Sequence, residues 1–221
     1  IVQSDKESTG PTGGQFFLRV VFHLPNLSHQ LARLEQEFDG EVARSLNASF
    51  KLRDASSLTR VAVFVSRRDH CLLDLLWRAR RAELPIKVVL VISNHPDLGD
   101  DVGAFGIPFE NVPVIKGQKS QAEQRQLDLL RVKVDLVVLA RSMQILSGDF
   151  LERVEVPVIN IHHSFLPAFA GAEPYERAKA RGVKLIGATA HYATEDLDEG
   201  PIIEQDVVRV SHRASVAELT R

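Results

Sequence analysis

The sequence predicts an α/β protein with a parallel, doubly wound sheet, preceded by a smaller region of a different kind. From residue 60 onward, short runs that are apolar at nearly every position alternate with helical segments. Such runs are typical of strands buried on both faces of a parallel sheet, joined by right-handed helical crossovers. Before residue 55 the pattern instead indicates one strand–helix–strand unit, which is small for a free-standing domain.

The amino-acid composition indicates what kind of protein this is and what kind of partner it binds. The 221 residues are 44% hydrophobic and 25% charged, which is typical of a folded soluble protein. Lys and Arg total 27 against 29 Asp and Glu, a net charge of −2, so neither nucleic acid nor a membrane surface is an expected partner. No apolar run approaches the ~20 residues that span a bilayer. A single cysteine, Cys71, excludes an internal disulfide, and we expect a cytoplasmic protein with a small-molecule partner.

The first 55 residues predict a short α/β unit. Residues 1–14 are rich in Ser, Thr, Gly and Pro and predict a turn, and residues 15–24 predict a strand. A helix is expected to begin at Ser28 and to end at Gly40. Alternating polar and apolar residues over 47–54 predict a second strand.

The remainder predicts the doubly wound domain. Residues 55–59 read as a linker, so the expected domains are 1–55 and 60–221. The predicted strands are residues 61–65, 86–92, 134–140, 156–160 and 185–192, and the predicted helices are residues 71–81, a short helix near Val102, and residues 121–130.

Ligands of open parallel sheets bind beyond the carboxyl ends of the strands. Polar residues follow four of the predicted strands, at 66–68, 93–95, 141–143 and 160–164. Neither a G-x-G-x-x-G nor a G-x-x-x-x-G-K-[ST] loop is present in the sequence, so a dinucleotide or ATP is not predicted. The sequence also lacks an H-E-x-x-H pair and a His–Cys cluster, so a metal is not predicted either.

Asn160 and His162 are two residues apart, so on a continuing strand they share one face. An amide donor and an imidazole there can stabilise a tetrahedral oxyanion and move a proton. Alternatively, Asn160 caps the strand end and His162 has a purely structural role. The two residues on their own favour this second interpretation. The acidic turn at 194–201 either delivers a carboxylate to a histidine or is a solvated loop, and the pattern does not choose.

Four longer motifs resemble the formyltetrahydrofolate deformylases, whose catalytic domain is related to glycinamide ribonucleotide formyltransferase. They cover most of the chain after residue 60. The motifs are SNH at 93–95, LARSMQILS at 139–147, INIHHSFLPAFAGAEPY at 159–175, and RGVKLIGATAHYATEDLDEGPIIEQD at 181–206.

The resemblance implies a two-part fold. Residues 60–221 would form a Rossmann-like formyltransferase domain, and residues 1–55 an ACT-like, ferredoxin-like α+β region. The first strand and helix of the ACT-like region would precede Ile1, and the family's C-terminal helices would follow Arg221. ACT domains commonly sense small molecules, so the resemblance implies an amino-acid effector. We also expect a homo-oligomer, because a lone β-α-β unit leaves an apolar face or a strand edge uncovered.

The resemblance also implies an activity, the hydrolysis of 10-formyltetrahydrofolate to formate and tetrahydrofolate, supplying formate for purine synthesis. Folate is then the substrate, and neither a separate cofactor nor a metal is required. The family's catalytic residues fall on Asn160, His162 and Asp198. Ser142 departs from the family, which is expected to carry Tyr there. The implied substrate-binding residues are Met143, Gln144, Ile145, Leu146, His163 and Thr194.

Two alternative functions accompany the hydrolase. A formyltransferase acting on an amine, such as glycinamide ribonucleotide, would use the same three catalytic residues. Its phosphate-holding turn is rich in Gly and Ser, whereas residues 66–71 contain no Gly and include the acidic Asp69, which favours hydrolysis. The other alternative, an inactive folate-binding or regulatory protein, is disfavoured because all three polar residues are present.

Overall fold

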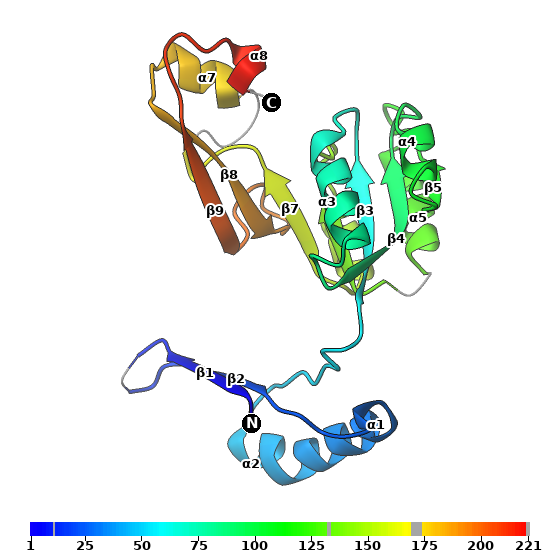
Figure 1. Ribbon diagram of the computed structural model, residues 1–221, viewed down its shortest axis with the longest axis vertical. Coiled ribbons are helices and arrows are strands. Elements are labelled where there is room, and N and C mark those ends of the chain that lie inside the picture. The colour runs from blue at the N-terminus through cyan, green and yellow to red at the C-terminus, as the bar shows by residue number, and fades with distance from the viewer. Residues whose placement is uncertain (11, 132–133, 169–173, 220–221) are drawn as a thin grey trace. The chain divides into compact units, whose positions relative to one another are not determined.

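The computed structural model describes residues 1–10, 12–131, 134–168 and 174–219. The chain forms two compact units, Ile1–Ser57 and Leu58–Arg221 (Figure 1). Unit 1 contains β1 (Gln3–Ser8), β2 (Phe16–Val21), α1 (Leu27–Phe38), the π-helical turn η1 (Asp39–Ala43) and α2 (Arg44–Leu46). Unit 2 contains β3 (Thr59–Val65), α3 (His70–Arg80), β4 (Ile86–Ser93), α4 (Gly99–Gly103), β5 (Phe109–Asn111), α5 (Lys119–Leu130), β6 (Leu136–Leu139), α6 (Gly148–Arg153), β7 (Val158–His162), α7 (Pro174–Ala180), β8 (Leu185–Tyr192), β9 (Ile202–Arg209) and α8 (Val216–Leu219).

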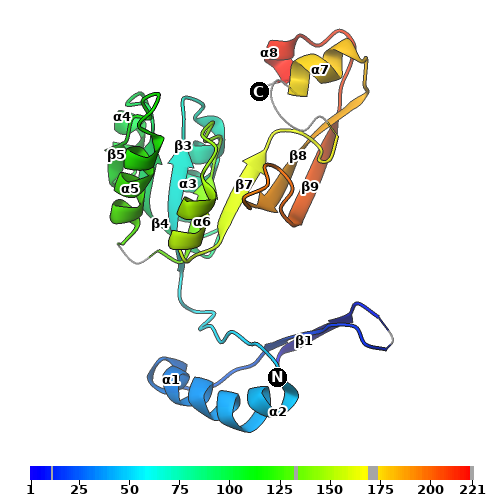
Figure 2. The same cartoon turned by 180° about the vertical axis from the view of Figure 1, so that it is seen from behind.

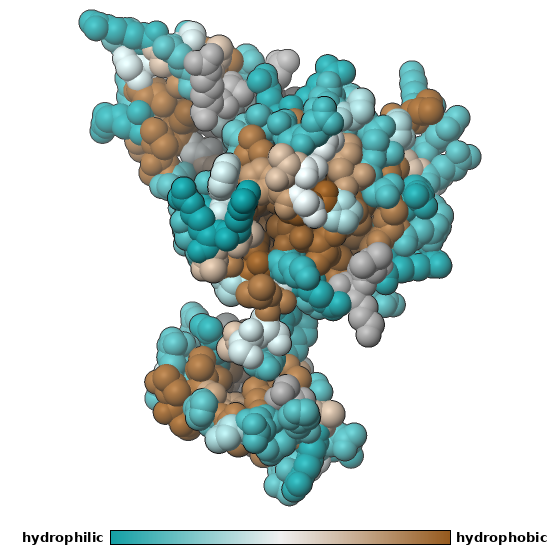
Figure 3. All heavy atoms as spheres, turned by 45° about the vertical axis from the view of Figure 1, so that its right-hand side comes forward, coloured by the Kyte–Doolittle hydropathy of each residue, from teal (hydrophilic) through white to brown (hydrophobic). Residues whose placement is uncertain are grey.

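Unit 1 begins with an antiparallel hairpin rather than a turn and one strand. β1 pairs with β2, and Ser8 lies opposite Phe16. The sequence QSDKES did not predict β1, because all the side chains of this strand are exposed. The strand pairs through backbone groups alone. Apolar side chains of β2 also lie on the surface of this unit (Figure 3), where Phe16, Phe17 and Leu18 are each more than half exposed.

The other expectations for unit 1 need two corrections. Gly40 does not end the helix, which continues through η1 and α2 until Asn47 adopts the left-handed conformation at φ 49°. Residues 47–54 form no strand and pair with no strand among the described residues. Phe50 instead packs against Phe38 of α1, with ring centroids 4.8 Å apart. Unit 1 is therefore a β-β-α arrangement.

Unit 2 confirms the predicted α/β class and the parallel-rich sheet. Its seven described strands run in the order β5-β4-β3-β6-β7-β8-β9. The first five are parallel, whereas β8 and β9 add to one edge in antiparallel fashion. The chain leaves β3 for β4 and β5 on one side and then crosses to β6 on the other. The crevice beyond the ends of β3 and β6 is thus a topological switch point, where ligands of such sheets bind.

The core lies on both faces of the parallel strands. In β3, Val61, Val63 and Val65 pack into one apolar cluster, and Ala62 and Phe64 pack into the other. Helices α3 and α4 contribute to the first cluster, and α5 and α6 to the second. Figures 1 and 2 show these helices from opposite sides of the sheet. Burial of alternate side chains on both faces explains why the strand reads as a continuous apolar run.

Several elements of unit 2 were not predicted. β5 and α6 are short, and α7 follows residues 169–173 of the INIHHSFLPAFAGAEPY motif, which lie outside the described residues. β9 was not predicted, because it is an edge strand and nearly all of its side chains are exposed. Neither face of β9 therefore carries the continuous apolar pattern that identified the central strands.

Candidate active site

Two polar side chains emerge where β7 reaches the carboxyl edge of the sheet. Asn160 and His162 are alternate residues of this strand, so both project toward the same pocket. Asn160 is partly exposed, while the side chain of His162 is only 8% exposed. The spacing that suggested a shared face therefore places both groups at one site.

Asp198 reaches His162 from the turn after β8. Its Oδ1 lies 3.2 Å from Nδ1 of His162, and its side chain is only 7% exposed. Asp198 adopts a left-handed backbone at φ 61°, a conformation that Asp tolerates better than most residues. At Gly200 any Cβ would fall on the carbonyl oxygen of Tyr192, so only glycine lets the turn close against β8. The Thr194 hydroxyl donates to the Asp196 carbonyl at 3.0 Å and braces the turn.

His191 fixes the orientation of the Asn160 amide. The two residues are direct partners across β7 and β8, and Asn160 Nδ2 lies 3.1 Å from His191 Nε2. His191 Nδ1 lies 3.0 Å from the Tyr192 carbonyl oxygen, which can only accept. A neutral His191 must therefore donate from Nδ1 and accept at Nε2 from the Asn160 amide. The second hydrogen of that amide is left for a ligand.

Two hydrogen-bond clamps hold the loop after β6. At its start, the Met143 N–H donates to the Ser66 hydroxyl at 3.1 Å, and that hydroxyl donates to Asn94 at 2.7 Å. At its end, the buried Glu123 carboxylate accepts from the Ser147 N–H at 2.8 Å and from the Ser147 hydroxyl at 2.7 Å. These hydrogen bonds join the loop to Ser66, directly after β3, and to Glu123 of α5.

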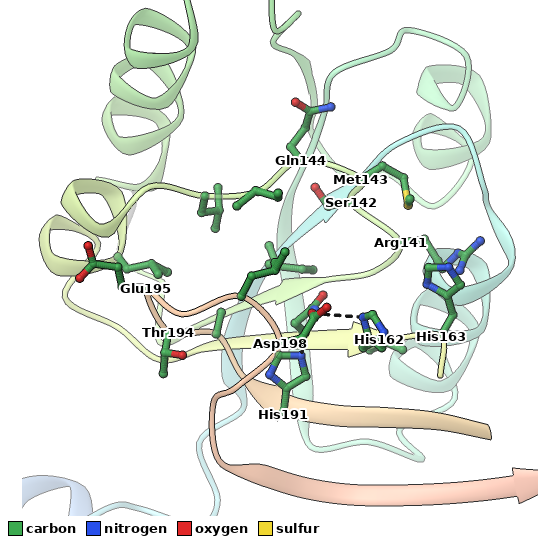
Figure 4. Close-up of a pocket in the computed structure, with 18 residues that line it drawn as sticks. Arg141, Ser142, Met143, Gln144, His162, His163, His191, Thr194, Glu195 and Asp198 are labelled. Carbon is green, nitrogen blue, oxygen red and sulfur yellow. Dashed lines mark hydrogen bonds and ion pairs between the residues drawn. The ribbon is translucent and has the colours of Figure 1, made fainter. Parts of the chain in front are cut away.

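These elements enclose a pocket of about 350 Å³ (Figure 4). Met143 and Ile145 line it although they are 61% and 58% exposed, so apolar surface is available to a ligand. The structure brings all nine sequence-predicted site residues to this pocket: Asn160, His162, Asp198, Met143, Gln144, Ile145, Leu146, His163 and Thr194.

Burial favours the neutral forms of His162 and His163. It lowers the pKa of His162; Asp198 opposes this effect, while His191 and Arg141 add to it. Burial also lowers the pKa of His163 to about 4, with the charges of Arg141 and His162 acting in the same direction. Both rings are therefore neutral near pH 7. With Nδ1 of His162 donating to Asp198, its Nε2 is left as a proton acceptor.

The shifted pKa of His163 predicts a pH-dependent stability. An unfolded His163 binds a proton near pH 6.5, whereas the folded one does so only near pH 4. Between these values the unfolded state holds more protons, so the free energy of unfolding should fall as the pH drops through this window. His163→Gln should flatten that fall in urea titrations, whereas His212→Gln, at an exposed position, should not. Equal slopes in the wild type and His163→Gln would contradict the assignment.

Sequence reasoning placed Ser66 in a polar segment at a strand end, but it did not reveal the long-range contacts that hold the pocket. Glu123, Ser66 and His191 each bond to a residue at least 24 positions away, which no local pattern reveals. Arg141 was noted only as part of a polar segment, yet it is buried and lines the pocket. Within the described ranges, no three His, Cys, Asp or Glu side chains form a possible metal site. No helix in those ranges is long and apolar enough to cross a membrane.

The fold and this pocket place unit 2 in a known class of protein. The Formyl transferase family model matches residues 59–221. The crystal structure of glycinamide ribonucleotide transformylase 1 from Symbiobacterium toebii superposes with a TM-score of 0.71 at 29% identity, covering 78% of this chain and 82% of that one. This match confirms the predicted formyltransferase fold.

Relatives that match nearly the whole chain narrow the class further. The formyltetrahydrofolate deformylase of Mycobacterium tuberculosis is 57% identical over 221 residues, which are 100% of this chain and 71% of that protein. The crystal structure of a formyltetrahydrofolate deformylase from Pseudomonas syringae pv. tomato gives a TM-score of 0.89 at 42% identity, covering 99% of this chain and 73% of that one. The chain belongs to the formyltetrahydrofolate deformylase family, as its motifs suggested.

Proposed function

We propose that this protein hydrolyses 10-formyltetrahydrofolate to formate and tetrahydrofolate. The observation that carries the proposal is the convergence of Asn160, His162 and Asp198 on one pocket, with His162 and Asp198 in contact at 3.2 Å. The 57% identity to a protein named formyltetrahydrofolate deformylase supports the same reaction. The chemistry requires an oxyanion donor, a proton carrier and a group that positions water, and these three side chains can fill those roles.

Asn160 is the proposed oxyanion donor. When water attacks the formyl carbon, negative charge develops on the carbonyl oxygen. The Asn160 amide is held by His191 at 3.1 Å through one hydrogen, so its second hydrogen can address that oxygen without reorganisation. A donor that is fixed before the reaction stabilises the transition state more than a mobile one does.

His162 and Asp198 are the proposed proton carriers. The carbon–oxygen bond to water forms, and the water proton passes to the His162–Asp198 pair. The tetrahedral intermediate then breaks its carbon–nitrogen bond, and the departing folate nitrogen takes a proton from His162. Formic acid ionises at neutral pH, so each turnover releases formate, tetrahydrofolate and one proton. Asp198 stabilises the imidazolium that forms transiently and keeps the ring oriented.

The folate is proposed to bind along the clamped loop after β6. The backbone groups of Gln144, Ile145 and Leu146 would bond to the edge of the pterin, and Met143 would pack against its face. His163 and Thr194 complete the proposed lining. The Ser66 and Glu123 clamps support this assignment, because they hold the loop backbone in place before a ligand binds. We propose that no cofactor beyond the folate is needed.

Stoichiometry tests the proposed reaction. Purified protein given 10-formyltetrahydrofolate should release formate and tetrahydrofolate in a 1:1 ratio, and addition of glycinamide ribonucleotide should not reduce the formate. A loss of formate matched by formylated amine would identify a transferase. Folate binding without either product would identify a binding protein.

Asn160→Ala should lower kcat by about a hundredfold to a thousandfold, as is typical of a lost oxyanion donor. The dissociation constant for a non-hydrolysable folate analogue should change little, because the amide acts on the developing charge. Asn160→Asp, which keeps the size but not the N–H donors, should be at least as impaired. A kcat within a few-fold of wild type for either variant would remove Asn160 from the mechanism.

Unit 1 is proposed to be an ACT-like region that pairs with a second copy of the chain and binds a small amino acid. The exposed apolar side chains of β2 support the first part, since water disfavours such a surface. Light scattering should give a mass above that of one chain, and a monomer at all practical concentrations would count against the pairing. The cytoplasmic location and the role in purine synthesis stay predictions from the sequence.

A further inference from the structure

Arg141 is a buried cation for which the described part of the chain shows no hydrogen bond or ion pair. It follows β6 directly, is 9% exposed and adopts a left-handed backbone at φ 61°. Its Nε atom has no hydrogen-bond partner among the described residues, and none of the ion pairs in that part of the chain involves it. A buried guanidinium without a counter-charge is costly, and non-glycine residues hold such a backbone mainly where the surroundings enforce it. Both features are typical of functional sites.

The surroundings of Arg141 leave room for an anion. In Figure 4 its side chain extends toward His163, whereas Asp198 lies on the other side of His162. Asp198 is already engaged by His162 at 3.2 Å, and His162 and His163 are neutral near pH 7. The pocket therefore carries the Asp198 carboxylate on one side of His162 and, on the other, a cation that has no counter-charge among the described residues.

The proposed reaction produces one new anion in this pocket. The formyl group of the substrate is neutral, and so is the formamide that transfer to an amine would give. Hydrolysis alone converts the formyl group into a carboxylate. A guanidinium binds a carboxylate through two parallel hydrogen bonds, which neither neutral group can match.

We propose that Arg141 binds the carboxylate of formate as it forms, and thereby favours water over an amine as the acceptor. The inference rests on the proposed function and extends it by a residue outside the expected catalytic set. Binding that strengthens only as the carboxylate develops stabilises the product side of the reaction more than the substrate. Carboxylates of a glutamate tail on the folate offer the same chemistry, so the experiment must separate the two sources.

The test uses [13C]formate as the probe and three variants. Arg141→Met removes the charge. Arg141→Lys keeps the charge but lacks the two parallel N–H donors of the guanidinium. Arg68→Met removes an exposed charge next to β3 and is the matched control. Formate affinity is measured from 13C line broadening at constant ionic strength. Thermal melting establishes that each variant is folded. If Arg141→Met does not fold, the formate affinity of Arg141→Lys is compared with that of the wild type instead.

Arg141→Met should weaken formate binding by about tenfold to a hundredfold, as expected for a lost charged hydrogen-bonded pair. Arg141→Lys should be intermediate and Arg68→Met unchanged. In turnover, Arg141→Met should lower kcat to the same degree for folates with and without a glutamate tail. Equal formate affinity in the wild type and Arg141→Met would overturn the proposal. A defect seen only as a raised KM for folates with the tail would assign Arg141 to the tail instead.

Failure of this proposal is distinguishable from failure of the proposed function. Formate binding is measured without turnover and tests Arg141 alone. If the wild type hydrolyses 10-formyltetrahydrofolate but Arg141→Met binds formate normally, only the role of Arg141 is wrong. If the wild type releases no formate from the folate, the proposed function is wrong, and with it the claim that Arg141 favours water.

Discussion

His162→Ala is expected to lower kcat for formate release by about a hundredfold to ten-thousandfold, the usual range for a lost general acid–base group. The imidazole is buried against Asp198 at 3.2 Å, and its Nε2, which has no hydrogen-bond partner among the described residues, is available to exchange protons in the pocket. Alanine removes both functions. Affinity for a non-hydrolysable folate analogue should change only a few-fold, because the pterin is expected to bind the backbone of the loop after β6.

The control for this variant is His212→Ala, which removes an exposed histidine of the same unit. It should retain the wild-type kcat. If His162→Ala loses folate affinity in proportion to kcat, the ring is a binding group and the proton-transfer role is wrong. Single-turnover measurements separate the chemical step from product release.

Asp198→Asn is expected to have a comparable effect, because it keeps the shape of the side chain while removing its charge. The Asp198 charge raises the pKa of His162 against the lowering effect of burial. Without it, the His162 pKa should fall further, so the protonated form needed to release the folate nitrogen becomes harder to reach. NMR titration of the His162 ring should show the lower pKa directly.

Asp196→Asn is the matched control, since Asp196 is an exposed acid of the same turn and accepts from Thr194 through its backbone only. It should leave both kcat and the His162 titration unchanged. A larger loss in Asp196→Asn than in Asp198→Asn would show that the wrong carboxylate has been assigned.

The central sheet was predictable because its strands are buried on both faces. Val61 and Phe64 of β3 point to opposite sides of the sheet, yet both are buried, so the run is apolar throughout. The hairpin strand β1 and the edge strand β9 were not predictable in this way, since their pairing depends on backbone groups and their side chains are mostly exposed. The strand expected at residues 47–54 does not form, and Phe50 packs against Phe38 of α1 instead.

The candidate site was predictable only in part from the residues themselves. The two-residue spacing of Asn160 and His162 indicated a shared face, whereas the choice of Asp198 within the acidic turn 194–201 rested on family resemblance. Arg141 was not singled out within the polar segment 141–143, because its burial without a counter-charge among the described residues depends on the packing of several elements. The orientation of Asn160 by His191 depends on the register of β7 and β8, which the sequence does not specify.

The central claim is that water, and not an amine, accepts the formyl group. Isotopically labelled solvent oxygen tests this claim directly. Turnover of 10-formyltetrahydrofolate in H₂¹⁸O, analysed by mass spectrometry, should give formate in which one of the two oxygens comes from the solvent, with glycinamide ribonucleotide present or absent. This result follows only if water attacks the formyl carbon. Recovery of the formyl group on the amine, with its original oxygen and without labelled formate, would contradict hydrolysis and identify this protein as a formyltransferase.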